Sequence, residues 1–389
     1  MEVSKVNLVD GQRANFPALE GKAYLNFGGQ GVMARATLDA VRDAFEFIQK
    51  EGPFSAKTLK WISDEGERVK AALASELGGD PDCYALVQNA TEGCNIVMWG
   101  INWSPDDHIV TTDAEHSGVD AAVRNLAARQ GLRVSKILLS ISSVDKSDDE
   151  IVAMFRDAIE ERTKLVVVSH VLWNTGRRLP LAGIQAVCRE AGVQLLVDGA
   201  QSAGVIPMNL SKEPIDFYTV TGHKWIGGAE GVGALIIRRE LIPWLEKTFV
   251  GWRSSMNFAD NAEQVASRFE VATTSFPLWT SLPVAIRVHQ QWGTAQERFD
   301  KQLENVKLLR AELGRIGVVD FYSPADASSG LVSFAVRGAK THAQIAAELE
   351  ASNVMIRTVP LPDALRASVH YFSNENDISK LCEHLRACL

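Results

Sequence analysis

Residues 164–173 read KLVVVSHVLW, a nearly continuous apolar run that is rich in valine. Two shorter runs of the same kind follow, VQLLV at 193–197 and FYTV at 217–220. Strands that are buried on both faces have this composition, because helices cover a parallel sheet on each side. Helical stretches such as 181–191 alternate with these runs. The alternation predicts an α/β fold whose ligands bind near the carboxyl ends of the strands.

The length of 389 residues predicts a large and a small domain, because a single core rarely grows beyond about 250–300 residues. We expect a large α/β domain over 20–265 and a small α+β domain over 266–389, joined by the N-terminal segment 1–19. Two amphipathic helices are expected early in the large domain, at 34–50 and 61–77. In the first of them the apolar face comprises Leu38, Val41, Phe45 and Ile48. In the small domain helices are expected within 280–316, 341–352 and 376–388, and strands at 331–336 and 354–358.

Composition and charge exclude several classes of protein. The 46% hydrophobic and 23% charged content is typical of a globular chain, and a net charge of −8 without a basic run argues against a nucleic-acid partner. No run of about 18 apolar residues predicts a membrane helix, and the first residues do not resemble a signal peptide. The five cysteines fit neither a disulfide framework nor a metal site. We therefore expect a cytoplasmic protein without a metal.

Two motifs suggest the chemistry. The first, VDGAQSAG at 197–204, places Asp198 at the end of a predicted strand, and the second, TVTGHKW at 219–225, places Lys224 after the next strand. A lysine in such a pocket can form a Schiff base, and a pyridine ring that acts as an electron sink needs an acid beside its nitrogen. Alone, such an aspartate is usually a cap and such a lysine a solvated charge. Together they predict pyridoxal 5′-phosphate (PLP) as the cofactor, bound covalently to Lys224.

A third motif, QNATEG at 88–93, precedes an apolar helical run. Thr91 is the expected N-cap of that helix, and a helix N-terminus is a ready phosphate site. The motif therefore predicts a phosphate-binding turn.

With these motifs the whole chain resembles the class V aminotransferase family of PLP fold type I, which includes the cysteine desulfurases. The resemblance implies a large domain with a mainly parallel seven-stranded sheet. It also implies that Asp198 contacts the pyridinium nitrogen, that Gln201 contacts the phenolic oxygen and that His116 stacks on the ring. The residues that it implies for the phosphate are Ala90, Thr91, Thr221 and His223.

For the substrate, the resemblance implies that an arginine at position 366 holds the α-carboxylate. A guanidinium fork suits this task because it binds a carboxylate through two hydrogen bonds. Arg357, nine residues earlier, is a second candidate. Family members are homodimers in which a threonine of the partner reaches the phosphate, and Thr273 is the better match, with Thr274 as the alternative.

The absence of a cysteine from one segment narrows the choice of reaction. Cysteine desulfurases carry a nucleophilic cysteine on a loop before the carboxylate arginine, whereas residues 323–368 contain none. Cys382 and Cys388 belong to a core-like face of the last predicted helix.

Segments 26–31 (NFGGQG), 172–176 (LWNTG), 250–254 (VGWRS) and 268–273 (RFEVAT) are similar to those of the cysteine/cystine C–S lyases of the family. This narrower resemblance implies β-elimination from L-cystine, L-cysteine or a cysteine S-conjugate, giving pyruvate, ammonia and a thiol or persulfide. It also implies that Lys224 is the general base, that Gln30 and Trp252 line the substrate pocket and that Asn174 lies near the phenolic oxygen. The alternatives are a cysteine desulfurase-like enzyme, an isopenicillin N epimerase-like enzyme and a non-catalytic protein of the same fold.

Overall fold

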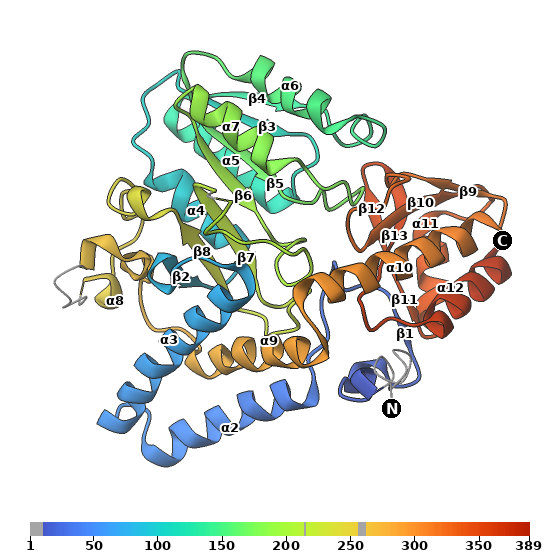
Figure 1. Ribbon diagram of the computed structural model, residues 1–389, viewed down its shortest axis with the longest axis horizontal. Coiled ribbons are helices and arrows are strands. Elements are labelled where there is room, and N and C mark those ends of the chain that lie inside the picture. Colours follow the sequence, from blue (N-terminus) through green and yellow to red (C-terminus); the bar gives the residue numbers. More distant parts are fainter. Residues whose placement is uncertain (1–10, 214, 256–261) are drawn as a thin grey trace.

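The computed structural model describes residues 11–213, 215–255 and 262–389, and its larger part is built on a seven-stranded sheet (Figure 1). The strand order is β2-β8-β7-β6-β5-β3-β4. All neighbours are parallel except β8, which is antiparallel to β2 and β7. The strands are β2 (Tyr84–Val87), β3 (His108–Thr112), β4 (Arg133–Ile137), β5 (Thr163–Ser169), β6 (Gln194–Asp198), β7 (Phe217–Thr221) and β8 (Gly233–Ile237).

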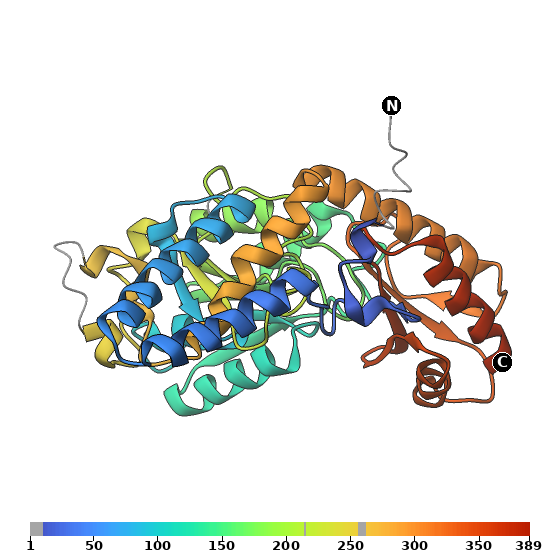
Figure 2. The ribbon, with the colours of Figure 1, turned by 90° about the horizontal axis from the view of Figure 1, so that it is seen from below.

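Helices cover both faces of this sheet (Figures 1 and 2). They are α4 (Ala90–Gly100), α5 (Ser117–Gln130), α6 (Asp148–Ala158) and α7 (Leu181–Glu190). α4 and α5 connect successive strands in the direction from β2 towards β4, at the edge of the sheet. α6 and α7 connect successive strands in the opposite direction, from β4 back to β6. Right-handed crossovers therefore place α4 and α5 on one face and α6 and α7 on the other. Because both faces are covered, the central residues of β5 (165–168) and β6 (195–197) are all apolar and buried, as their composition predicted.

The smaller part is an antiparallel sheet with helices on it. Its strand order is β12-β13-β10-β9, and the two-stranded parallel sheet β1–β11 lies beside it. The bounds are β1 (Ala23–Tyr24), β9 (Val319–Phe321), β10 (Leu331–Val336), β11 (Val354–Met355), β12 (Arg357–Pro360), β13 (Asp363–Ser368), α11 (His342–Ala351) and α12 (Glu375–Cys388). The predicted strand 354–358 is thus two strands in two sheets. The architecture confirms the predicted fold class, PLP fold type I with a large mainly parallel sheet.

Two helices in the region 280–316 join the two parts (Figure 1). α9 (Ser281–Trp292) packs against α2 (Arg35–Glu51) and α3 (Ala56–Leu77), whereas α10 (Ala295–Gly314) packs against α12. A capping box formed by Thr294 and Glu297 begins α10 and separates it from α9. The predicted domain boundary at residue 265 stays a prediction.

The predicted apolar face of the helix at 34–50 is only partly buried. α2 buries Ile48 together with Thr37 and Ala44. Leu38 and Phe45, which were predicted to share its apolar face, are 40% and 45% exposed. The helix itself was predicted correctly, but the described residues leave this side of α2 partly uncovered.

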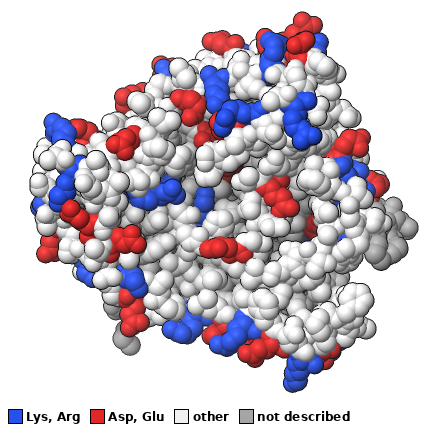
Figure 3. Space-filling view, turned by 180° about the vertical axis from the view of Figure 1, so that it is seen from behind, with Lys and Arg blue, Asp and Glu red and all other residues white. Residues whose placement is uncertain are grey.

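The hydrophobicity of the helices and the charges on one face (Figure 3) bear on the expectations from the sequence. Among the helices of the described residues, none is long and apolar enough to cross a bilayer. On the face shown in Figure 3, acidic and basic side chains are interspersed, and neither kind gathers into a large patch. The predicted cytoplasmic location stays a prediction.

Candidate active site

The carboxyl ends of β3, β5, β6 and β7 open into one cavity of about 380 Å3. The segments that follow these strands carry the motifs singled out from the sequence, and the β12–β13 hairpin of the smaller part completes the walls. The predicted site residues that line the cavity are Ala90, Thr91, His116, Asp198, Gln201, Thr221, His223, Lys224, Arg357 and Arg366. Parallel strands end at one edge of the sheet, so residues far apart in the chain meet here.

Lys224 and Asp198 lie in this cavity as a cation and an acid on neighbouring strand ends. Burial is the main cause that lowers the pKa of Lys224 to about 8, and the charges of Arg366 and Arg357 lower it further, while Asp198 opposes them. Asp198 is buried, and its Oδ1 accepts a hydrogen bond from the amide of Ala200 at 2.8 Å. Lys224 therefore loses its proton at a lower pH than an exposed lysine does, which favours its action as a nucleophile or base.

The backbone of Lys224 is held by a close approach of the chain at Gly31. The amide of Gly31 donates to the carbonyl of His223 at 2.7 Å. A Cβ on Gly31 would lie 1.8 Å from the carbonyl oxygen of Lys224, which no side chain could tolerate. Glycine is therefore required here to seat the lysine loop.

The two histidines of the cavity are both kept neutral. Burial, followed by the charge of Lys224, lowers the pKa values of His116 and His223. His116 is the N-cap of α5, and its Nδ1 accepts from the amide of Gly118 at 3.2 Å, so the ring proton is on Nε2. Nδ1 of His223 shares a 2.7 Å hydrogen bond with the hydroxyl of Thr221. Each ring is thus oriented by a hydrogen bond through Nδ1.

The turn before α4 differs in one detail from the prediction. The N-cap is Asn89, whose Oδ1 accepts from the amide of Glu92 at 3.0 Å. Ala90 and Thr91 are the first residues of the helix, so Thr91 is not the cap that was predicted. Asparagine is as good a cap as threonine, and it leaves the Thr91 hydroxyl at the helix N-terminus beside the cavity.

Gln201 is held by two hydrogen bonds within the chain. Its Nε2 donates to the carbonyl of Gly28 at 2.7 Å, and its Oε1 accepts from the indole of Trp225 at 2.9 Å. One Nε2 proton remains for a group in the cavity.

Trp173 lies between the arginines and His116, and the sequence analysis did not single it out. The Arg357 and Arg366 guanidiniums lie 5.9 and 6.0 Å from the centre of its ring, and the His116 ring meets it edge-on at 5.8 Å. Its carbonyl accepts from Nη1 of Arg366 at 2.6 Å. The available signal was its position at the end of the apolar run 164–173, where a parallel strand delivers its next residues to the ligand edge.

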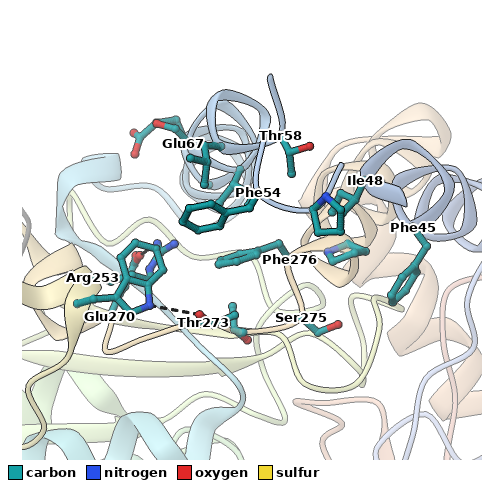
Figure 4. Close-up of a pocket in the computed structure, with 18 of the residues that line it drawn as sticks. Phe45, Ile48, Phe54, Thr58, Glu67, Arg253, Glu270, Thr273, Ser275 and Phe276 are labelled. Carbon is teal, nitrogen blue, oxygen red and sulfur yellow. Dashed lines mark hydrogen bonds and ion pairs between the residues drawn. The ribbon is translucent and has the colours of Figure 1, made fainter. Parts of the chain in front are cut away.

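Four other predicted residues do not line this cavity. The buried Asn174 donates from Nδ2 to the carbonyl of Leu361 at 2.7 Å, and its Oδ1 has no hydrogen-bond partner among residues 11–213, 215–255 and 262–389. Gln30 donates to the Glu230 carboxylate at 2.5 Å. The remaining two, Trp252 and Thr273, hydrogen-bond to each other at 3.2 Å and line a separate cavity (Figure 4).

The residues of the first cavity fit PLP on chemical grounds. Such a cofactor needs an amine for its aldehyde, an acid for its ring nitrogen, a flat group over the ring and donors for its phosphate. Lys224, Asp198 and His116 are the amine, the acid and the flat group, and the start of α4 with Thr221 offers the donors. Nε and Nη2 of the buried Arg366 have no partner among the described residues, which leaves them for a carboxylate.

Comparison with known proteins gives the same answer. A family model described as Aminotransferase class-V matches residues 35–381. Two solved structures of the protein C-DES are 36% and 37% identical to this chain, with TM-scores of 0.92 and 0.91. They cover 96% and 95% of this chain and 98% and 99% of their own. One is a variant with glycine covalently linked to the PLP cofactor, and the other is described as a complex between this cystine C–S lyase and its product, cysteine persulfide.

Two curated relatives are more distant. The isopenicillin N epimerase of Streptomyces clavuligerus is 26% identical over 386 residues, which are 93% of this chain and 94% of that protein. The cysteine desulfurase of Haloferax volcanii is 24% identical over 420 residues, 97% of this chain and 96% of that protein. These findings confirm that PLP is the cofactor and that the chain is a PLP-dependent enzyme related to C–S lyases and desulfurases.

Proposed function

The chain belongs to the class-V aminotransferase family, and from this premise we propose that it is a C–S β-lyase. Its substrates are L-cystine, L-cysteine or a cysteine S-conjugate, and its products are pyruvate, ammonia and a thiol or persulfide. The resemblance to the cystine C–S lyase C-DES at 37% identity supports this reaction over those of the more distant relatives.

The observation that carries the proposal is a cavity with two arginines and no thiol. All five cysteines of the chain are buried, and none lines the cavity. Cys382 and Cys388 pack in the core of the smaller part, as the sequence predicted. A desulfurase needs a cysteine that attacks the substrate sulfur, whereas β-elimination expels the sulfur without one. The second arginine suits a substrate such as cystine, which has two carboxylates.

The reaction needs a carboxylate clamp, a base and an acid. We assign Arg366 to the α-carboxylate and Arg357, which is exposed and nearer the solvent, to a distal carboxylate. Nζ of Lys224 removes the Cα proton, the Cβ–S bond breaks, and the electron pair leaves with the sulfur. Water then converts the remaining three-carbon unit to pyruvate and ammonia. Bound PLP supplies the electron sink that makes the Cα proton acidic, and Asp198 keeps its ring nitrogen protonated.

Other side chains orient the cofactor and the substrate. His116 would cover the ring face, the remaining Nε2 proton of Gln201 would be donated to the phenolic oxygen, and Ala90, Thr91, Thr221 and His223 would hold the phosphate. These assignments follow the resemblance to the family. The amide of Asn174 would donate to the phenolic oxygen if it released the carbonyl of Leu361. Gln30 and Trp252 would line the entrance through which the substrate reaches the cavity.

We also propose that the enzyme is a homodimer. Phe45 and Phe54, 45% and 86% exposed, line a cavity of about 650 Å3 together with Trp252, Phe276 and Thr273 (Figure 4). Apolar surface of this kind marks an interface. A second copy over it would cover the exposed face of α2 and bring Thr273 of one subunit to the phosphate of the other.

Mixing two inactive variants tests this arrangement. The Lys224→Ala and Thr273→Ala variants are mixed, dissociated and allowed to reassociate, so that hybrid dimers form. If the sites are shared, the Thr273→Ala subunit supplies Lys224 and the Lys224→Ala subunit supplies Thr273 to one complete site per hybrid dimer, and activity returns. If each Thr273 acted within its own subunit, no site would be complete and the mixture would stay inactive.

The reaction itself is tested by product analysis. The PLP-loaded protein is incubated with L-cystine and with L-cysteine, and pyruvate and alanine are measured, with Lys224→Ala as the control. Pyruvate that depends on Lys224 supports the lyase. Alanine would mean a desulfurase, and a change of configuration without pyruvate would mean an epimerase.

A further inference from the structure

Glu115, the residue before His116, is a carboxyl buried behind the active site. Its Oε1 accepts from the hydroxyl of Thr112 and its Oε2 from the hydroxyl of Ser169, each at 2.7 Å. It does not line the cofactor cavity, and nothing in the proposed reaction uses it. A buried carboxyl with two hydroxyl donors is expensive to maintain, so its presence calls for a reason.

Its contacts reach three segments that carry site residues. Ser169 ends β5 and lies opposite Asp198 in the β5–β6 pairing. The carbonyl of Glu115 accepts from the indole nitrogen of Trp173 at 3.2 Å. His116 follows directly in the chain. Glu115 thus contacts, or directly adjoins in sequence, segments that hold Asp198, His116 and Trp173. The Trp173 ring is also the one that lies near both guanidiniums.

The carboxyl is also electrostatically close to the acid. Burial raises the pKa of Glu115 to about 7, the two hydroxyls oppose this, and the neighbouring Asp198 raises it further. Among the described residues, Cys94 of α4 also faces this position: burial raises the pKa of its thiol most, and Asp198 and Glu115 raise it further. With a pKa of about 7, Glu115 is partly ionised at neutral pH, and its negative charge then favours protons on the groups around Asp198.

We propose that Glu115 is a positioning residue, which acts through Asp198, His116 and Trp173 and touches neither cofactor nor substrate. The inference rests on the roles proposed above for Asp198 and His116. It assigns Glu115 two effects: its hydrogen bonds align these side chains, and its charge strengthens the hold of Asp198 on the proton of the ring nitrogen.

The Glu115→Gln variant separates these effects from a purely structural role. An amide cannot accept from both hydroxyls through two oxygens, and it carries no charge. We expect kcat to fall about tenfold or more, because a hydrogen bond to a charged group is lost, while KM stays within about twofold. Without substrate, the pH transition in the absorbance of the bound cofactor should move to lower pH, because a negative charge near Asp198 is gone.

Three variants make the outcome decisive. Glu65→Gln removes another buried glutamate, on α3 and away from Asp198, and should change neither readout. Ser169→Ala removes one donor to Glu115 and decides the question if Glu115→Gln does not fold, again by a loss in kcat with KM preserved. Asp198→Asn should itself shift the absorbance transition, because the carboxylate proposed to lie beside the ring nitrogen is lost. If it does, and Glu115→Gln and Ser169→Ala behave like the Glu65→Gln control, the inference is overturned. If Asp198→Asn has no effect, the role proposed for Asp198 is wrong and the inference falls with it.

Discussion

Replacement of Arg366 by methionine should stabilise the free protein and weaken substrate binding. The guanidinium is fully buried, and within the part of the chain that the structure describes only its Nη1 has an acceptor, the carbonyl of Trp173 at 2.6 Å. Burial, together with the like charge of Arg357, lowers its pKa to about 9. No carboxylate of the described residues lies within ion-pair distance of it. The positive charge of Arg366 therefore has no counter-charge among the described residues, and a carboxylate ligand would supply one.

The magnitudes follow from this geometry. A buried charge without a partner costs several kcal/mol, whereas the hydrogen bond lost to the Trp173 carbonyl costs about 1–3 kcal/mol. We therefore expect the melting temperature of Arg366→Met without substrate to rise by a few degrees, roughly 2–4 °C per kcal/mol gained. Loss of a buried charged contact costs a ligand about 2–5 kcal/mol, which is about 30- to 4,000-fold in affinity.

Thermal unfolding of the apoprotein and kcat/KM for L-cystine measure the two effects. Arg310→Met is a matched control, because Arg310 also donates to a carbonyl, that of Ser323, and lies 4.2 Å from an aromatic ring, that of Phe321, but far from the site. The control should leave KM unchanged. A KM for Arg366→Met within threefold of wild type would refute the assignment, and a lower melting temperature would refute the argument from the unpaired charge.

Three further outcomes are expected. Because the pKa of Lys224 is lowered to about 8 and only its neutral amine reacts, the rate at which the apoprotein takes up PLP should rise with pH up to about 8 and level off above it, as measured by absorbance. Gly31→Ala should displace the Lys224 loop, since its Cβ would meet the Lys224 carbonyl at 1.8 Å, and dialysis should then remove the cofactor while the wild type retains it. Phe45→Asp should lower the dimer fraction seen by light scattering without lowering the monomer's stability by more than about 0.5 kcal/mol, because Phe45 is 45% exposed in a single chain.

Local patterns predicted much of the fold and the centre of the site. The runs that became β5, β6 and β7 are apolar because both faces are buried, and that demand is visible residue by residue. Asp198 and Lys224 follow two of these strands directly, so the sheet alone brings them to one edge. The same kind of pattern correctly predicted the helix α2 but not which of its apolar residues are buried, because periodicity shows which face is apolar and not what covers it.

Residues that depend on contacts between distant segments could not be derived in this way. Glu115 and Trp173 were not recognised, because a glutamate before a histidine and a tryptophan after a strand are ordinary in sequence. The packing of β3 against β5 buries the carboxyl of Glu115. The β12–β13 hairpin brings the guanidiniums of Arg357 and Arg366 to the ring of Trp173. The amino-acid order alone therefore predicted the strands of the large sheet, because burial on both faces is visible in each apolar run, and its motifs predicted PLP as the cofactor. The role of Lys224 stays a prediction. The tertiary structure decided which charges are left unpaired and which apolar faces are left uncovered, because desolvation depends on every segment that surrounds a group.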